Sequence, residues 1–548
     1  MSDHNTTIQS ISAQLWAMAN ELRGNMDAGE FKNYILAFMF YRYLSEHQEH
    51  YLETNKVIDI AEGQSVNDAY WAEAIGEAPV SYSADTTSDD LMDYREDISK
   101  SLGYAIDPGD TWASLLHRIK DKNMLPSDYQ TLFDHFNANA ALNSEAEQDF
   151  SGVFNDINLG DSRLGASTTA RAKSLNAIVK MVDEINYIGE DGEDILGEIY
   201  EYLIGQFAAS AGKKGGEFYT PHQVSKILAR IVTQGADANQ TGFSVYDPTM
   251  GSGSLLLTVG SELTGGHRPG AVKYYGQELN TTTYNLARMN LMMHGVSFNN
   301  MTLNNADTLE RDWPDGPDAK GVDRPRSFDA VVANPPYSAK WDNAETKLKD
   351  PRFKDFGKLA PASKADFAFV LHSFYHLGQG GTMAIVLPHG VLFRGAAEAK
   401  IRKALIVDKN ALDTVIGLPA NLFYGTSIPT TILVLKRNRT TKDILFIDAS
   451  KEFEKVKNQN RLTDAHIDKI IDTYTARQDV DKYAHLATRE EIEENDYNLN
   501  IPRYVDTFEE EPPIDLDEVN RLLKQDDEEI AKLEEEINAQ LRLLGVEV

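Results

Sequence analysis

The sequence contains no cysteine among its 548 residues. Disulfides, zinc sites built on thiolates and cysteine nucleophiles are therefore excluded, and this composition fits a reducing compartment. Long apolar runs are also missing, because no stretch of 18 apolar residues occurs and residues 1–30 lack the apolar core of a signal peptide. We expect a cytoplasmic protein that does not span a membrane.

Positive charge is scarce as well. The chain has 53 Lys and Arg residues against 85 Asp and Glu residues, which gives a formal net charge of −32. Such a chain repels nucleic acid unless its positive groups are gathered locally or another subunit supplies them. The charge argues against an autonomous DNA-binding protein, but it is compatible with a protein that meets DNA through a partner.

Helical patterning dominates the first part of the chain. Two helical patterns, at 173–186 and 192–209, directly precede the first strand signal near residue 243. Before them, apolar residues recur at helical spacing from Ile8 to about Ser45, and helical patterns return at 91–102, 110–121 and 128–150. We therefore predict an all-helical N-terminal domain over residues 1–160.

Between 243 and 449, short β-rich runs alternate with helical stretches. This alternation predicts an α/β fold with a doubly wound, Rossmann-like and mostly parallel sheet, which we assign to a domain over residues 161–475. Two runs, Thr414–Leu418 and Thr430–Leu435, are joined by a loop without a helix, so one of them is expected to be antiparallel. The expected strands are Phe243–Tyr246, Tyr274–Gly276, Met301–Leu303, Phe328–Ala333, Thr382–Leu387, Thr414–Leu418, Thr430–Leu435 and Ile444–Ile447.

Residues 476–548 form a charged tail that ends in a predicted helix. Its apolar residues follow steps of three and four, broken at Asp526 and Gln540, and are Leu516, Val519, Leu523, Ile530, Leu533, Ile537 and Leu544. This series is typical of a short coiled-coil seam that pairs with a partner or with a second copy. A helix packed on its own domain would give the same pattern.

A glycine-rich turn, Asp247-Pro-Thr-Met-Gly-Ser-Gly253, follows the first expected strand and opens a helix. Glycines there let backbone N–H groups approach a ligand closely. The third glycine of a dinucleotide-binding motif is missing, and an aspartate at the strand end opposes a pyrophosphate and favours a cation. S-adenosylmethionine, a sulfonium cofactor with an amino-acid end, fits these charges better than NAD.

Further acidic residues follow the next strands. Glu278 stands at the tip of the second strand, where a carboxylate can accept both hydroxyls of a ribose, and Asp307 follows the third strand, where it can accept from an adenine amino group. Each acid alone is most often a solvated loop residue. Three of them at successive strand ends predict a nucleoside-containing cofactor.

The fourth of these strands ends in Asn334-Pro-Pro-Tyr337. Two prolines stop the strand and leave its last polar groups at the carboxyl edge of the sheet. The side-chain oxygen of Asn334 and the carbonyl of Pro335 could accept hydrogen bonds from one exocyclic amino group, while the ring of Tyr337 stacks on the base that carries it. Taken alone, the same four residues could be an ordinary strand-ending turn.

Together these features resemble the amino-group DNA methyltransferases, in which a glycine-rich cofactor loop precedes an (Asp/Asn/Ser)-Pro-Pro-(Tyr/Phe) loop. The segment Gly216-Glu-Phe-Tyr-Thr-Pro221 looks like the cofactor-binding segment of the γ arrangement. With the helical N-terminal domain, the stretch Leu418–Ser427 and the C-terminal helix, the chain resembles the M (modification, HsdM) subunit of type I restriction-modification systems. The resemblance implies an N6-adenine DNA methyltransferase that uses S-adenosylmethionine.

The resemblance also implies roles for particular residues. Adenine would be held by the catalytic residues Asn334, Pro335, Pro336 and Tyr337, with Phe423 or Tyr424 as a further wall of its pocket. The cofactor would contact Glu217, Phe218, Tyr219, Thr220, Pro221, Asp247, Thr249, Gly251, Gly253, Glu278, Asp307 and Thr308. The segment Asp366–Phe369 sits where the family places pocket-lining residues, although a helix start with core aromatics explains it equally well.

One expected partner follows from what the chain lacks. No segment outside the helical region and the sheet is long and basic enough to read bases in a groove, so a separate specificity subunit would choose the DNA target. The resemblance implies DNA, this specificity subunit, a restriction subunit in the full complex and two M subunits per specificity subunit.

Two other functions and one metal site are weighed against this interpretation. The chain could methylate a protein glutamine, because the amide of that side chain also presents an NH₂ to the Asn334 loop. A non-catalytic scaffold could instead bind S-adenosylmethionine as a stabiliser. His372 and His376 stand four apart on an expected helix, but without a third ligand we predict a core or surface pair and no metal.

Overall fold

A computed structural model describes residues 13, 16, 28–76, 82, 88–121, 124–185, 196–210, 219–237, 239–265, 268, 270–310, 326–423, 426–456, 459–507 and 516–544. The chain divides into two compact units, Met1–Val505 and Asp506–Val548. None of the helices in these ranges combines the length and the apolar character needed to span a bilayer. The boundaries expected near 160 and 475 stay predictions.

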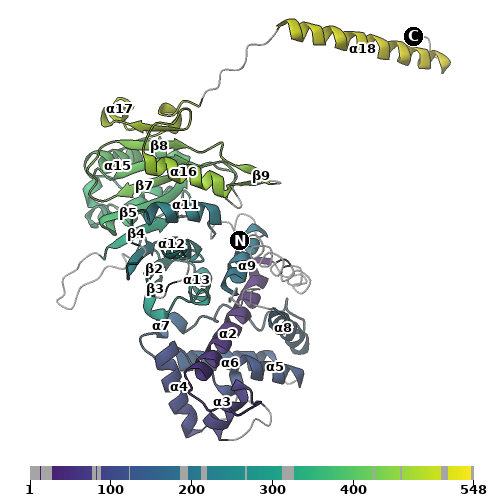
Figure 1. The fold of residues 1–548 in the computed structure, drawn as a ribbon, viewed down its shortest axis with the longest axis vertical. Coiled ribbons are helices and arrows are strands. Elements are labelled where there is room, and N and C mark those ends of the chain that lie inside the picture. Colours follow the sequence, from purple (N-terminus) through teal and green to yellow (C-terminus); the bar gives the residue numbers. More distant parts are fainter. Residues whose placement is uncertain are drawn as a thin grey trace. The chain divides into compact units, whose positions relative to one another are not determined.

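The N-terminal part of the first unit is helical, as predicted (Figure 1). Its central helix, α2, is buried over eight consecutive residues, Tyr34–Tyr41, because other helices, α8 and α9 among them, pack around it. Of the helical pattern expected from Ile8 to about Ser45, the part from Ala28 onward is confirmed by α2, and the part before it lies outside the described residues except at positions 13 and 16. The helices are α2 (Ala28–Thr54), α3 (Val66–Ile75), α4 (Asp89–Leu102), α5 (Trp112–Lys120), α6 (Pro126–Ala140), α7 (Glu147–Phe150), α8 (Thr168–Asp183) and α9 (Leu196–Ser210).

The helical pattern expected over 128–150 corresponds to two helices, α6 and α7, which are separated by a turn. Asn143 in this turn accepts hydrogen bonds through its side-chain oxygen from the N–H groups of Glu145, at 3.0 Å, and Ala146, at 3.3 Å. A short polar side chain that bonds nearby backbone competes with the helix for those groups. Apolar periodicity alone does not reveal this competition.

Polar contacts tie the helical part to the α/β part. The buried Arg288 guanidinium donates to the carbonyl oxygens of Gln148, Asp149 and Ser151 at 3.0, 3.1 and 2.9 Å. The Tyr43 hydroxyl donates to the carbonyl of Met292 at 2.9 Å. The bonds from Arg288 satisfy carbonyl groups in the turn around α7, and the bond from Tyr43 adds a second donor to the carbonyl of Met292, which also accepts from the N–H of Gly295.

The α/β part contains a nine-stranded sheet in the order β11-β8-β6-β7-β5-β4-β1-β2-β3. Strands β1 to β5 are mutually parallel, and β7 runs antiparallel to both β5 and β6, which confirms the predicted reversal. All eight expected strands are present, whereas β9, β10 and β11 were missed. The strands are β1 (Phe243–Asp247), β2 (Val272–Glu278), β3 (Met301–Asn305), β4 (Phe328–Ala333), β5 (Leu377–Pro388), β6 (Leu412–Gly417), β7 (Thr430–Lys436), β8 (Ile444–Asp448), β9 (Glu454–Val456), β10 (Gln459–Arg461) and β11 (Ala484–Ala487).

Helices cover both faces of the sheet, as a doubly wound fold requires. Alternate strand residues enter two separate cores: Val245 packs in the core with α11, α12, α13 and α16, and Tyr246 packs in the core with α14 and α15. The helices are α11 (His222–Val232), α12 (Ser254–Thr264), α13 (Thr281–Met293), α14 (Asp366–Tyr375), α15 (Ala396–Val407), α16 (Asp464–Ala476) and α17 (Arg489–Glu494).

Register brings the predicted site residues to one edge of the sheet. Asp247 is paired with Gly276, and Glu278 is paired with Asn305, so β1, β2 and β3 all end at the same edge. The end of β4 joins them there, since Val245 and Tyr246 pair with Ala330 and Val331. The Asn334 loop therefore emerges beside the glycine-rich turn, at the edge where open α/β sheets bind ligands.

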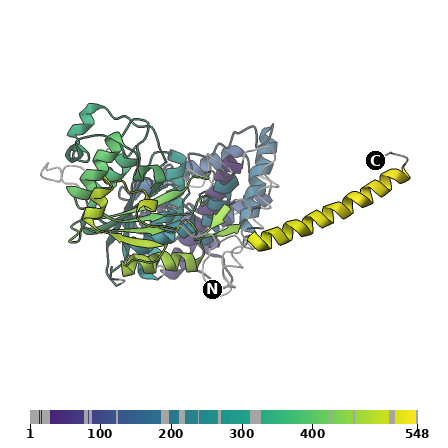
Figure 2. The same ribbon diagram turned by 90° about the horizontal axis from the view of Figure 1, so that it is seen from above.

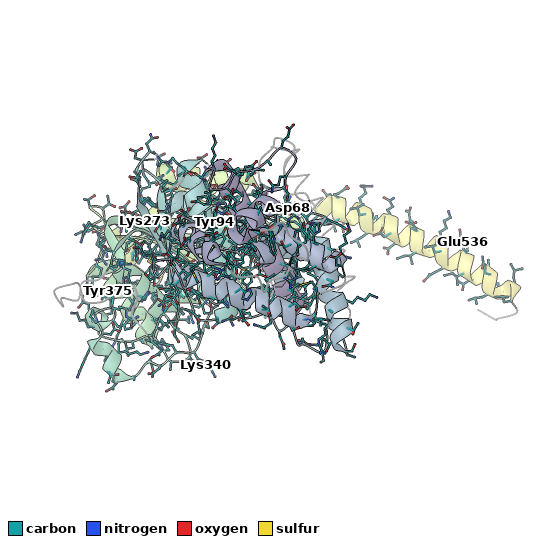
Figure 3. All side chains as sticks on the ribbon, turned by 90° about the horizontal axis from the view of Figure 1, so that it is seen from below. Asp68, Tyr94, Lys273, Lys340, Tyr375 and Glu536 are labelled. Atoms are coloured by element: carbon teal, nitrogen blue, oxygen red, sulfur yellow. The ribbon has the colours of Figure 1, made fainter. Side chains whose placement is uncertain are left out.

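The second unit contains one long helix, α18 (Leu516–Leu543), seen from above in Figure 2. None of its residues is buried, and side chains project from it on all sides, with Glu536 labelled in Figure 3. The apolar seam is exposed too, including Leu523, Ile530 and Ile537, which are 55%, 54% and 57% exposed. The predicted helix is confirmed, and its pairing stays a prediction.

Candidate active site

A cavity of about 590 Å³ opens at the carboxyl edge of β1, β2, β3 and β4. Three loops and the starts of two helices form most of its wall, so residues far apart in sequence converge on it. Its lining comprises Tyr219, Thr220, Pro248, Thr249, Met250, Gly251, Ser252, Ser254, Leu255, Glu278, Leu279, Asn280, Thr281, Asp307, Thr308, Leu309, Asn334, Pro336, Ala339, Lys340, Trp341 and Phe369.

Asn334 is held between two hydroxyl groups. Its Nδ2 donates to Oγ1 of Thr220 at 3.0 Å, and the Tyr337 hydroxyl donates to its Oδ1 at 2.9 Å. These two bonds fix the plane of the amide, and Oδ1 keeps a second lone pair that can accept another donor. The arrangement joins the Asn334 loop to the segment before α11.

Aromatic rings surround the same loop. The rings of Tyr337 and Phe423 meet edge to face with 6.0 Å between their centroids, a favourable geometry for an aromatic pair. Burial raises the pKa of the Tyr337 hydroxyl, and the charge of Asp366 raises it further. Tyr337 therefore stays a neutral hydrogen-bond donor at physiological pH.

Glu278 organises the glycine-rich turn. Its carboxylate accepts from the N–H of Gly251 at 3.2 Å and from the N–H of Asn280 at 2.8 Å. Burial raises the pKa of Glu278, while these two backbone donors oppose the shift. The side chain lines the cavity and bridges the turns that follow β1 and β2.

Two glycines are required by the geometry of this region. Gly253 has a φ of +79°, and a Cβ built on it would lie 2.5 Å from Cδ1 of Leu291. A Cβ on Gly276 would lie 2.3 Å from Sδ of Met250, which belongs to the glycine-rich turn. At both positions the side chain of a neighbouring residue, Leu291 or Met250, lies so close to the glycine backbone that a Cβ would collide with it.

Asp247 is buried behind the turn rather than in the cavity wall. It is 2% exposed, and its Oδ1 accepts from the N–H of Thr249 at 2.9 Å. Burial raises the pKa of Asp247 to about 8, and the charge of Glu278 adds to the shift. The carboxyl group thus supports the turn through Thr249.

The turn after β3 completes the cavity wall. Asp307 accepts through Oδ1 from the N–H of Leu309 at 2.9 Å, and the Thr308 hydroxyl donates to the carbonyl of Pro248 at 2.5 Å. Arg352 donates to the carbonyl of Thr308 at 2.8 Å from the opposite side. This turn is therefore fastened to the glycine-rich turn.

The predicted site residues fall into three groups. Those that line the cavity are Tyr219, Thr220, Thr249, Gly251, Glu278, Asp307, Thr308, Asn334 and Pro336. Those placed behind or beside it are Pro221, Asp247, Gly253, Pro335, Tyr337 and Phe423. Glu217, Phe218 and Tyr424 lie outside the described residues.

Several lining residues have no role in the sequence prediction. Trp341 and Lys340 follow the Asn334 loop, and Leu279 and Asn280 follow Glu278, so proximity to the motifs was a usable signal. Phe369 lines the cavity from α14, whereas Asp366 does not, so one member of the ambiguous segment 366–369 faces the site. Figure 3 labels Lys340 at the periphery, and its side chain is exposed.

His372 and His376 form a core pair, as predicted. Both are fully buried, and Nε2 of His372 lies 2.8 Å from the Tyr246 hydroxyl. Nδ1 of His376 lies 2.7 Å from the carbonyl oxygen of Arg326. Burial lowers the pKa of His372 well below its usual range, so the ring is neutral.

Among the described residues, one cluster has its acidic and histidine ligand atoms close enough for a metal ion. Asp107, Asp110 and His135 lie within 4.8 Å of one another. Arg95 donates to both carboxylate oxygens of Asp107, from Nε at 2.7 Å and from Nη2 at 2.5 Å. Nη1 of Arg118 lies 3.6 Å from Oδ1 of Asp110. The cations already balance these acids, so the cluster is an ion-pair network of the helical part.

Comparisons with known proteins place the chain in a family. Residues 191–512 match the model of the N-6 DNA Methylase family, and residues 11–182 match the HsdM N-terminal domain. The Type I restriction enzyme MpnII methylase subunit of Mycoplasma pneumoniae is 38% identical over 526 residues, which are 94% of this chain and 92% of that protein. The MjaIX methylase subunit of Methanocaldococcus jannaschii is 27% identical over 97% of this chain and 90% of that protein.

A solved structure agrees with these matches. The type I restriction-modification methyltransferase subunit from Streptococcus thermophilus superposes with a TM-score of 0.80 at 48% identity, over 91% of this chain and 100% of that one. A modification subunit from Vibrio vulnificus, 18% identical with a TM-score of 0.58 over 91% of this chain and 97% of that one, shares the fold. The chain belongs to the methylase subunits of type I restriction-modification enzymes.

Proposed function

We propose that this methylase subunit transfers a methyl group from S-adenosylmethionine to N6 of an adenine that is flipped out of DNA. The observation that carries the proposal is the position of Asn334, whose amide lines the cavity beside the glycine-rich turn. An amide oxygen and a proline carbonyl at this point match the two N–H groups of an exocyclic amine.

The cavity suits the proposed cofactor. Its volume of about 590 Å³ is in the usual range for small-molecule sites, and its polar wall is acidic at Glu278 and Asp307. Glu278 would bind the ribose hydroxyls, and Asp307 with Thr308 would bind the adenine of the cofactor. S-adenosylmethionine would supply an electrophilic methyl group at its sulfonium.

The remaining proposed cofactor contacts divide between direct and indirect ones. Tyr219 and Thr220 line the cavity and would contact the methionine part, next to Glu217, Phe218 and Pro221. Thr249 and Gly251 would face the amino-acid end. Asp247 and Gly253 would act through the shape of the turn, because neither belongs to the cavity wall.

The chain's own groups account for activation of the amine. Hydrogen bonds from the N6 protons to Asn334 Oδ1 and to the Pro335 carbonyl would draw the nitrogen lone pair out of conjugation with the ring. This lone pair would then form the N–C bond as the S–C bond of the sulfonium breaks, with the sulfur keeping the bonding pair as a neutral thioether and one N6 proton passing to water. Tyr337, with Phe423 behind it, would stack on the flipped base and repay part of the cost of unstacking it. Pro336 would keep the loop extended.

Protein glutamine methylation and a non-catalytic scaffold are less favoured. The similar proteins are methylase subunits of DNA restriction-modification enzymes, and the match extends over both the helical and the α/β parts. Asn334 and Tyr337 are both present, and the Tyr337 hydroxyl donates to Oδ1 of Asn334 at 2.9 Å, which orients the acceptor proposed for the amine.

The proposed partners are DNA, a specificity subunit that reads the target and a restriction subunit in the full complex, with two methylase subunits per specificity subunit. The net charge of −32 disfavours DNA binding by the chain alone. Lys340, the one cationic side chain among the described cavity-lining residues, is exposed where DNA phosphates would approach. The exposed seam of α18 is the surface proposed to bind the specificity subunit, and the complex would act in the cytoplasm.

Mass spectrometry of nucleosides tests the chemistry. PCR-amplified genomic DNA, which carries no methyl groups, is incubated with the chain, the specificity subunit and S-adenosylmethionine, and then digested. We expect N6-methyladenine, and methylated cytosine alone would refute the proposal. The chain without its partner should give no sequence-specific product, and a chain that ends at Val505 should bind the cofactor normally but fail to bind the partner.

A further inference from the structure

Ser338, the residue directly after the Asn334 loop, has a left-handed backbone with a φ of +52°. Residues other than glycine rarely adopt this conformation, and they keep it only where the surroundings impose it. The turn at Ser338 sets the direction in which the chain leaves Tyr337. The conformation of the catalytic loop therefore depends on whatever holds Ser338.

A buried carboxylate holds it. Oδ1 of Asp366 accepts from the N–H of Ser338 at 2.8 Å, and Asp366 is fully buried at the first residue of α14. Its other oxygen, Oδ2, pairs with Arg394 at 2.6 Å. Arg394 in turn lies 3.1 Å from Glu398, so the carboxylate has a fixed position and a balanced charge.

Neighbouring backbone bonds fasten the same two segments together. The N–H of Ala365 donates to the carbonyl of Ala339 at 2.9 Å, and the N–H of Trp341 donates to the carbonyl of Ala362 at 3.0 Å. These bonds join backbone groups only, so they do not depend on the identity of a side chain. The bond to Ser338 is different, because it depends on a charged side chain of one residue type.

We propose that Asp366 is a positioning residue for methyl transfer, which holds the Asn334 loop in its reactive shape through the backbone of Ser338. The inference rests on the proposed function and deepens it. Asp366 does not line the cavity, so its effect on catalysis passes through the loop. Arg394 and Glu398 are the supports that keep its carboxylate aimed at Ser338.

A purely structural role makes a different prediction. An aspartate in the first turn of a helix stabilises that helix through its dipole wherever the helix lies. In that case its removal would lower the stability of the protein, and no change at Ser338 would compensate. A positioning role predicts compensation by a residue that adopts a positive φ without help.

The experiment is a double-mutant cycle between Asp366→Ala and Ser338→Gly, measured on the complex with the specificity subunit and PCR-amplified DNA. Asp366→Ala is expected to lower kcat roughly 10- to 100-fold, the effect of losing one charge-assisted hydrogen bond. The cofactor Kd and the KM for DNA should stay within about threefold, since neither binding surface is altered. Ser338→Gly alone should change kcat by no more than about threefold.

The informative variant combines both changes. Glycine adopts a φ near +52° without strain, so the double variant should regain about tenfold in kcat over Asp366→Ala. Lys482→Gly is the matched control, because Lys482 is an exposed non-glycine residue with a φ of +57° in the turn before β11. Asp366→Ala combined with Lys482→Gly should regain nothing.

Two further arms keep the outcome decisive. If Asp366→Ala does not fold, Asp366→Asn serves in its place. Its amide oxygen can still accept from the N–H of Ser338, but its NH₂ group faces the Arg394 guanidinium, which is also a donor. We expect kcat to fall about three- to tenfold, and Ser338→Gly should again restore it. An absence of rescue, or equal rescue by Lys482→Gly, would overturn the positioning role. Full activity of Asn334→Ala would instead overturn the proposed function, so the two failures are distinguishable.

Discussion

The raised pKa of Asp247 makes one contribution to the stability of this protein depend on pH. Its pKa is about 8 in the folded chain, against 3.8 for an ordinary aspartate, because the carboxyl group is buried. Between these two values the folded protein keeps a proton that the unfolded chain releases. The contribution of Asp247 to stability is therefore largest below about pH 4, falls as the pH rises through this window and levels off above about pH 8.

The size of the effect follows from the shift. One pKa unit corresponds to 1.36 kcal/mol, so a shift of roughly four units corresponds to at most about 5 kcal/mol at pH 8. Asp247→Asn removes this titration and keeps an oxygen that can accept from the N–H of Thr249. The variant should therefore unfold at a temperature several degrees higher than the wild type at pH 8, and the difference should vanish near pH 4.5.

The assay is differential scanning fluorimetry of both proteins from pH 4.5 to 8.5. Asp237→Asn is the matched control, because Asp237 makes the same bond to the N–H two residues on, at 2.8 Å to Asn239, but is exposed. It should follow the wild type at every pH. A constant offset between Asp247→Asn and the wild type across this range would refute the reasoning, because it would show that the carboxyl group is ionised throughout.

Two other variants test single contacts of the site. Thr220→Val removes the hydroxyl that accepts from Asn334 Nδ2 at 3.0 Å, so kcat should fall about tenfold. Thr220→Ser keeps the hydroxyl, so its kcat should stay within about threefold of the wild-type value. A larger loss of cofactor affinity than of kcat would contradict an effect through Asn334. Gly253→Ala places a side chain at a φ of +79°, with its Cβ 2.5 Å from Cδ1 of Leu291, so it should lower the unfolding temperature by several degrees. An unchanged unfolding temperature in fluorimetry would contradict this, because it would show that the turn accepts a side chain without strain.

Much of the fold could be predicted because its signals are local. The apolar run that ends at Asn334 is a buried strand, and the two prolines after it can neither continue the strand nor enter a helix. Parallel strands then bring Glu278 and the Asn334 loop to one edge without further information. The short strands β9, β10 and β11 were missed, because three or four residues carry too little periodicity.

The site could be predicted less fully, because side-chain direction depends on register and on distant contacts. Asp247 and Glu278 both stand at strand ends, but only Glu278 lines the cavity, since Asp247 turns back to its own loop. Phe369 reaches the cavity from α14, and no local pattern separates its role from that of Asp366. The hold of Asp366 on Ser338 spans 28 residues and is visible only in the fold.

The central claim is that Asn334 activates the adenine amine, and transfer of a tritiated methyl group from S-adenosylmethionine to DNA tests it most directly. The complex with the specificity subunit is compared with the same complex carrying Asn334→Ala, after both are shown to bind cofactor and DNA equally. The account predicts that incorporation into DNA falls at least about 100-fold in the variant, since the amine loses an acceptor that acts in the transition state. Equal incorporation by the two complexes would contradict the account.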